Sequence, residues 1–205
     1  MGSRIMHLII AEQIANKISI SNKEAFILGG VAPDAVTSKE ISHFYIGNLS
    51  DFTRSIDFNG FFENYKEMFP SDYLLGYYIH LIADDLWLKG FYMPWLKNRM
   101  ENDESILELY HNDFRLLNGK LLNFYHINDV QIHNTDTIDE ICDLNEVHIE
   151  DIKAFLPFLY EDIQYEEAVL DENLNVFTFN QIIGYIETSI EKALYHLKDF
   201  DLVLD

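Results

Sequence analysis

The sequence predicts an all-α protein that forms one compact multi-helix domain over residues 1–205. Two observations carry this prediction. Apolar residues recur three and four positions apart along most of the chain, and strand-like alternation is nearly absent, with 175–179 as the one short candidate strand. The chain has 205 residues, of which 48% are hydrophobic and 14% aromatic. A chain of this length and composition can bury the core of a single domain.

The expected helices begin and end at recognisable signals. The first covers 5–18, where apolar residues follow i, i+3, i+4 spacing. A capping box from Ser21 to Glu24 begins the second helix, and Gly29-Gly30 and Pro33 end it. Polar residues over 34–57 predict a long loop, which in a compact domain is often functional. Further helices are expected at 71–89, 103–118, 121–125, 138–144 and 149–165, with a polar loop over 128–137 and a kink at Pro157.

The last helix has the clearest start. Thr178 and Gln181 have the spacing of a capping box. An apolar stripe follows at i, i+4 and i+3 spacing and predicts one buried helix face: Ile182, Ile186, Ile190, Ala193 and Leu197.

The charge of the chain restricts its partners. It has 35 acidic and 14 basic residues, a formal net charge of −21. Duplex nucleic acid and anionic membranes attract clusters of Lys and Arg, which the sequence lacks. We therefore expect no duplex nucleic acid partner. The longest apolar run, 73–83, is too short to span a bilayer, so we expect no stable membrane insertion.

The single cysteine, Cys142, fits a reducing compartment. The N-terminal apolar stretch is interrupted by His7 and does not form the hydrophobic segment of a signal peptide. We therefore expect a cytoplasmic protein. The sequence leaves the oligomeric state open.

His80 and Asp84 are the strongest candidates for chemistry. They lie four residues apart in the expected helix over 71–89, so their side chains project from the same face one turn apart. That face is largely apolar, and a buried carboxylate needs a partner, a hydrogen bond or a metal. The alternative is a core histidine that is hydrogen-bonded to Asp84.

Three other residues join this pair as candidate metal ligands. Asp34 follows Pro33 just past a helix end, His43 lies in the long loop, and His7 lies in the first helix. Taken singly, each has an ordinary explanation: a surface turn, a solvated loop histidine and a core histidine.

Taken in order, these motifs resemble the bacterial zinc-dependent phospholipase C family, which is related to the zinc single-strand nucleases of fungi and plants. The resemblance covers roughly residues 1–100. It implies an all-helical fold of that type and a first zinc held by Asp34, His43, His80 and Asp84. It also implies a second metal, to which His7 and Asp84 contribute. The motifs behind it are His7, Gly29-Gly30-Val31-Ala32-Pro33-Asp34, Ser42-His43-Phe44 and the run from Gly76 to Asp84.

The family's third zinc has no counterpart here, because no His-x-x-x-Glu follows Asp84. One or two ions are therefore expected, with Zn²⁺ favoured and Fe, Mn or Ni compatible with imidazole and carboxylate ligands. His111 and Asp113 are either replacement ligands or part of a solvated helix face. Asp85 is either a hydrogen-bond acceptor for one of the metal ligands or an ordinary polar helix residue.

The resemblance implies hydrolysis of a small-molecule phosphoester, with Asp34 as ligand, general base or both in turn. Two alternatives stay open: a catalytically inactive helical binding domain, and a phosphohydrolase of the HD type. The second normally carries an adjacent His-Asp pair, which is absent here. The aromatic residues nearby either line a substrate pocket or fill the core: Tyr73, Tyr77, Trp87 and Trp95.

Overall fold

The computed structural model describes residues 3–127 and 141–200, and it confirms the all-α class. In the described residues the only strands form one two-stranded hairpin. The elements in chain order are α1 (Arg4–Ala15), α2 (Lys23–Val31), η1 (Ala32–Ala35), α3 (Lys39–Ser42), β1 (Tyr45–Ile46), β2 (Ser55–Ile56), α4 (Phe58–Tyr65), η2 (Lys66–Met68), α5 (Asp72–Trp87), η3 (Leu88–Leu96), α6 (Lys97–Asn102), α7 (Ser105–Phe124), α9 (Ile149–Ile163), η4 (Glu167–Leu170), α10 (Phe179–Leu197) and η5 (Lys198–Phe200).

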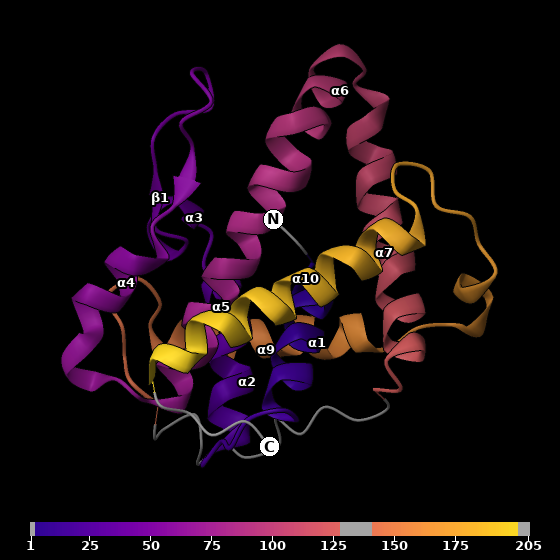
Figure 1. Ribbon diagram of the computed structural model, residues 1–205. Coiled ribbons are helices and arrows are strands. Elements are labelled where there is room, and N and C mark those ends of the chain that lie inside the picture. Colours follow the sequence, from indigo (N-terminus) through magenta and orange to yellow (C-terminus); the bar gives the residue numbers. More distant parts are fainter. Residues whose placement is uncertain (1–2, 128–140, 201–205) are drawn as a thin grey trace.

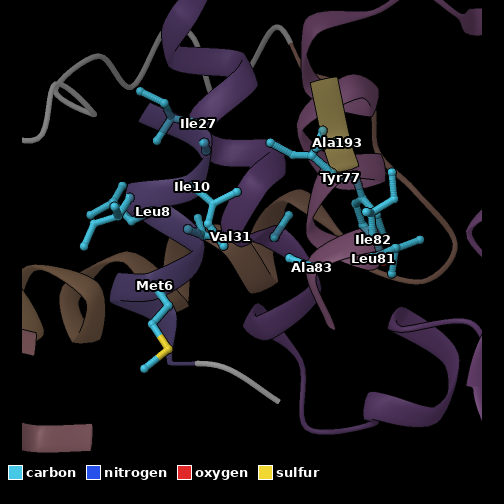
Figure 2. Packing of buried hydrophobic residues seen from close by; sticks show 14 of the residues in the cluster. Met6, Leu8, Ile10, Ile27, Val31, Tyr77, Leu81, Ile82, Ala83 and Ala193 are labelled. Carbon is cyan, nitrogen blue, oxygen red and sulfur yellow. The ribbon is translucent and has the colours of Figure 1, made fainter. Parts of the chain in front are cut away.

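The centre of the fold is a helix bundle in which α5 packs against α2 and α10, and α1 against α2, α5 and α10 (Figure 1). Figure 2 shows apolar side chains of α1, α2 and α5, with Ala193 of α10, meeting in this core. The expected apolar stripe of α10 is buried in full, because Ile182, Ile186, Ile190, Ala193 and Leu197 are each at most 1% exposed. The capping box of Thr178 and Gln181 is also present.

Glycines allow α2 and α5 to pack very closely. A Cβ on Gly29 would lie 2.0 Å from the Tyr73 carbonyl oxygen, and one on Gly76 would lie 2.0 Å from the Phe26 carbonyl oxygen. The prediction that Gly29-Gly30 ends the second helix is therefore wrong: α2 continues through both glycines to Val31. Its N-cap is Asn22, whose side chain accepts from the Ala25 N–H at 3.0 Å, and not Ser21 as the capping-box pattern predicted.

The expected loop over 34–57 contains more structure than predicted. It holds the second half of η1, then α3 and the β1–β2 hairpin, in which Tyr45 pairs with Ile56 in antiparallel register. The strand expected at 175–179 is wrong, since Phe179 already begins α10 and the preceding residues are irregular. The two real strands are each two residues long and show no alternation that a sequence pattern can detect.

Several helix boundaries also differ from the predictions. After Trp87 the chain continues in a π-helical segment, η3, which contains Pro94. The helices expected at 103–118 and 121–125 are one helix, α7, which runs through Gly119. Pro157 lies inside α9. A helix is expected at 138–144, but residues 141–144 are not helical. Residues 138–140 and the loop expected at 128–137 lie outside the described residues.

None of the helices in the described ranges combines the length and the apolar character needed to cross a bilayer.

Candidate metal site

His7 projects from the first turns of α1 into the core. Its side chain is 1% exposed. Neither ring nitrogen makes a hydrogen bond of acceptable geometry, although Nε2 lies 3.1 Å from Asp84 Oδ1. The ring stacks on that of His80, with 3.8 Å between ring centroids and 20° between planes. A buried imidazole without hydrogen bonds is costly unless another ligand satisfies it.

Asp34 lies in η1, directly after the close-packed end of α2. Its side chain is only 9% exposed. The Lys39 ammonium at the start of α3 donates to its Oδ1 at 2.7 Å and to its backbone carbonyl at 2.9 Å. These two bonds fix the carboxylate at the edge of the buried cluster.

His43 follows α3, and Ser42 determines how its ring is protonated. The Ser42 hydroxyl donates to the Pro33 carbonyl at 2.9 Å, so its single proton is already used. It lies 2.9 Å from His43 Nδ1 and therefore accepts from that nitrogen. A neutral His43 then carries its proton on Nδ1, and the lone pair of Nε2 points into the cluster. Tyr77 anchors this turn by donating to the Ser42 carbonyl at 2.6 Å.

His80 on α5 is oriented in the same way by α2. Its Nδ1 lies 2.9 Å from the Gly30 carbonyl oxygen, which can only accept. Nδ1 therefore holds a proton, and in the neutral ring Nε2 presents a lone pair. The close packing of α2 and α5 permits this contact, because Gly30 lies directly after Gly29, where the two helices approach most closely.

Asp84 lies among these imidazoles. Its Oδ1 is 3.1 Å from His7 Nε2, and its Oδ2 is 3.1 Å from His43 Nε2 and 3.7 Å from His80 Nε2. His43 Nε2 is 3.7 Å from Asp34 Oδ1, which completes the cluster. The structure thus brings together all five residues singled out from the sequence. Their donor atoms form two groups that share His80: His7, Asp34 and His80, and His43, His80 and Asp84.

The ionisation of the cluster follows from its burial. Burial lowers the pKa of both His7 and His43, because the charged imidazolium is poorly solvated there. Burial alone would raise the pKa of Asp84, but the imidazoles of His7 and His43 outweigh this and hold it well below its usual range. Likewise, Lys39 and the imidazoles outweigh burial at Asp34 and lower its pKa. Burial therefore favours the neutral imidazoles of His7 and His43, while the carboxylates of Asp34 and Asp84 are ionised.

This donor set fits a divalent metal ion. The second nitrogens of His43 and His80 are bound to fixed acceptors, as is usual for metal-ligating histidines. Their Nε2 atoms lie 3.3 Å apart and face an ionised carboxylate, and in the neutral rings both atoms carry lone pairs. Electron pairs so close repel one another unless a cation lies between them. Nitrogen and oxygen donors without thiolate suit Zn²⁺, with Fe, Mn or Ni also compatible.

A pocket of about 470 Å³ borders the cluster, and Asp34 belongs to both. Its wall comes from the start of α1 and from η1, α3, α7 and α9. Besides Asp34 it is formed by Ser3, Arg4, Lys39, Tyr110, His111, Phe114, Arg115, Asn118, Phe155 and Asp162. A larger pocket of about 540 Å³ beside η4 and the start of α10 contains none of the five candidate ligands. Of these two pockets, the smaller one is therefore the one that touches the cluster, through Asp34.

The other polar candidates have structural roles. Asp113 is fully buried and accepts from the backbone N–H groups of Asn175, Val176 and Phe177 at 2.7–3.0 Å. It supports the chain that enters α10 and is not a replacement ligand, while His111 lines the pocket wall. Asp85 accepts from the Ile56 N–H at 3.3 Å and pairs with Lys89, which ties the hairpin to α5.

The aromatic residues near His80 belong mainly to the core. Tyr73, Tyr77 and Trp87 are at most 1% exposed, and none of them lines the pocket beside the cluster. Trp95 is partly buried and also lies outside that pocket. The pocket's aromatic wall is instead Tyr110, Phe114 and Phe155, which the sequence pattern did not single out.

No family model matches the chain, and no curated protein or solved structure is significantly similar to it.

Proposed function

We propose that the protein is a metal-dependent hydrolase that acts on a small phosphoester. The observation that supports this best is the convergence of three imidazoles and two carboxylates beside a pocket, with the lone pairs of two histidines fixed toward one point. His7, Asp34, His43, His80 and Asp84 would hold one or two ions, most suitably Zn²⁺. Bound there, the metal would supply an activated water and positive charge to balance that of the phosphate.

The chain's own groups define the rest of the reaction. Asp34 lies where the pocket meets the cluster, and its carboxylate is ionised because of Lys39. It is thus placed to accept a proton from the attacking water, in addition to serving as a ligand. The water oxygen bonds to phosphorus, the ester P–O bond breaks, and the alcohol leaves with a proton. Phosphate and the free alcohol are the products of a monoester.

The resemblance of residues 1–100 to the zinc-dependent phospholipase C family favours this reaction class over the two alternatives. The adjacent His-Asp pair of an HD-type phosphohydrolase is absent from the sequence. We place the activity in the cytoplasm, because a single cysteine fits a reducing compartment. The excess of acidic residues argues against duplex nucleic acid as a substrate.

Metal content tests the proposal directly. The wild type, His80→Ala and His148→Ala are purified without chelator, and their bound metals are measured by elemental analysis. His148 is the matched control because its side chain is 62% exposed and pairs with Asp143 outside the cluster. We expect one or two equivalents of a transition metal in the wild type and in His148→Ala, and a loss in His80→Ala.

Hydrolysis is then measured with p-nitrophenyl phosphate and bis(p-nitrophenyl) phosphate. Turnover that disappears in His80→Ala supports the hydrolase. A folded wild type that contains no metal and takes none up on addition would refute it. In that case the non-catalytic binding domain becomes the better description.

A further inference from the structure

We infer that the pocket beside the cluster selects phosphomonoesters, which carry two negative charges, over phosphodiesters, which carry one. This inference rests on the proposed function and narrows its substrate class. It derives from the charges on the pocket wall, which differ in sign from the rest of the molecule.

Basic residues are scarce in this chain, and three of the 14 line this pocket. The chain has 14 Lys and Arg against 35 Asp and Glu. The pocket wall has three basic residues, Arg4, Lys39 and Arg115, against two acidic ones, Asp34 and Asp162. The wall therefore has a formal surplus of one positive charge in a chain whose net charge is −21, which favours the approach of an anion here over the rest of the molecule.

The two acidic groups of the wall are already paired. Arg4 Nε lies 2.6 Å from Asp162 Oδ2, and Asp34 pairs with Lys39 and lies within the cluster of metal-binding candidates. Arg115 is held less tightly: its side chain is 58% exposed and lies 3.8 Å from Glu172. Such an exposed pair contributes little and can yield to a stronger anion.

Lys39 is in the best position to contact the phosphate. An ammonium has three N–H donors, and those of Lys39 are directed at Asp34 Oδ1 and the Asp34 carbonyl, which leaves a third for a ligand in the pocket. The same Asp34 Oδ1 lies 3.7 Å from His43 Nε2, so only Asp34 separates the Lys39 ammonium from that ring. A phosphate next to the cluster would therefore meet a fixed positive charge at its edge.

A monoester matches this arrangement better than a diester. At pH 8 its second ionisation is nearly complete, and it presents three terminal oxygens that share two negative charges. A diester presents two oxygens and a single charge. The organic part of the ester would pack on the aromatic wall of Tyr110, Phe114 and Phe155.

Binding of two simple probes tests the inference without relying on turnover. The affinities of methyl phosphate and dimethyl phosphate for the full-length protein as purified are measured by calorimetry at pH 8. We expect the wild type to bind methyl phosphate at least about tenfold more tightly, since hydrogen bonds between charged groups are the strong ones. We expect Lys39→Met to lose most of this preference and Lys39→Arg to keep most of it.

Two further variants support the interpretation. Arg115→Gln changes an exposed side chain and should weaken methyl phosphate binding about threefold with the fold intact. Lys66→Gln is the control, because Lys66 forms a surface pair with Glu63 away from the pocket. Equal affinities of the wild type for the two probes would overturn the inference. A folded Lys39→Met variant that keeps the preference would also overturn it. If Lys39→Met does not fold, the inference is overturned by an Arg115→Gln variant whose affinity for methyl phosphate equals that of the wild type.

The outcome separates this inference from the proposed hydrolase. Preferential binding of methyl phosphate without hydrolysis of either nitrophenyl ester supports the anion pocket, although the hydrolase proposal then fails. Hydrolysis of either ester without any preference between the two probes overturns the monoester pocket and leaves the hydrolase standing.

Discussion

The Nε2 atoms of His43 and His80 lie 3.3 Å apart, and each ring has its other nitrogen bound to a different part of the chain. Ser42 sets the protonation of one ring and the Gly30 carbonyl that of the other. Each neutral ring therefore directs a lone pair at the same small volume, beside Asp84. The arrangement forms only when α2, the turn after α3 and α5 are all in place, so folding itself assembles the donor set.

Removing the Ser42 hydroxyl should weaken metal binding while the ligands remain. In Ser42→Ala, His43 loses the acceptor that fixes its protonation and ring orientation. Loss of such a contact typically lowers metal affinity by about 10- to 100-fold. Competition with a chromogenic chelator measures the effect. Ser105→Ala is the control, since the Ser105 hydroxyl bonds only to Asp103 at the surface; equal affinities in both variants would contradict the role of Ser42.

Alanine substitutions at two glycines should change the stability in opposite directions, because one glycine lies in the close contact between α2 and α5 and the other faces open space. In Gly76→Ala the new Cβ would meet the Phe26 carbonyl oxygen at 2.0 Å, so the helices must separate; we expect a loss of about 3 kcal/mol in the free energy of unfolding. In Gly184→Ala, within α10, the Cβ has no atom within 4 Å, and better helix propensity should add about 0.5–1 kcal/mol. Urea denaturation measures both. A Gly76→Ala protein as stable as the wild type would mean that the helices can separate without cost.

Asp113 should matter for stability and not for metal content. Its removal in Asp113→Ala leaves buried backbone N–H groups of Val176 and Phe177 without their acceptor, at a cost of about 3 kcal/mol. Asp171→Ala, at an exposed position, serves as the control. Chemical denaturation gives the stability, and elemental analysis of the folded protein gives the metal content. Loss of metal from a folded Asp113→Ala would instead make Asp113 part of the metal site.

Acidification should destabilise the metal-free protein below about pH 6.5. His7 and His43 have their pKa lowered in the folded state by burial, whereas in the unfolded state they titrate near 6.5. Below that pH the unfolded chain binds more protons than the folded one, so the free energy of unfolding decreases as pH falls. The slope is at most about 1.4 kcal/mol per pH unit for each histidine.

Urea denaturation in excess chelator between pH 8 and 5.5 measures this dependence. The His7→Gln variant lacks one of the two groups and should show a shallower slope. A wild-type profile that is flat below pH 6.5 would contradict the assignment of neutral imidazoles.

The candidate ligand positions could be picked out from the sequence because their order along the chain forms a pattern, although His7, Asp34 and His43 taken singly have ordinary explanations. His80 and Asp84 occupy one face of a largely apolar helix, and Asp34 follows the Pro33 turn. The protonation of the rings was not predictable. It depends on the Ser42 hydroxyl and the Gly30 carbonyl, and the second lies 50 residues from His80 in the sequence. The pocket wall was missed for the same reason, since it joins residues of α1, α3, α7 and α9.

The errors in the fold prediction also have a common physical cause. Gly29 and Gly30 favour a helix end when only local conformation is considered, but here they lie inside α2 because a neighbouring helix leaves no room for a Cβ. Gly119 in α7 is similar, with Tyr165 and Val169 packed against it. Val176 and Phe177 suggested a strand, but they are buried apolar residues of an irregular segment that Asp113 holds. In each case a tertiary contact outweighs the local preference.

The contact between the Gly30 carbonyl and His80 has a consequence for protein engineering. Transplanting the five candidate ligands into another helical scaffold would not reproduce this cluster, because the His80 ring is oriented by a main-chain atom that no side-chain substitution can supply. A design would have to import the glycine-lined helix crossing as well. Conversely, repacking the interior between α2 and α5 to gain thermal tolerance would change the orientation of the His80 ring, so stability and the geometry of the candidate site cannot be altered independently here.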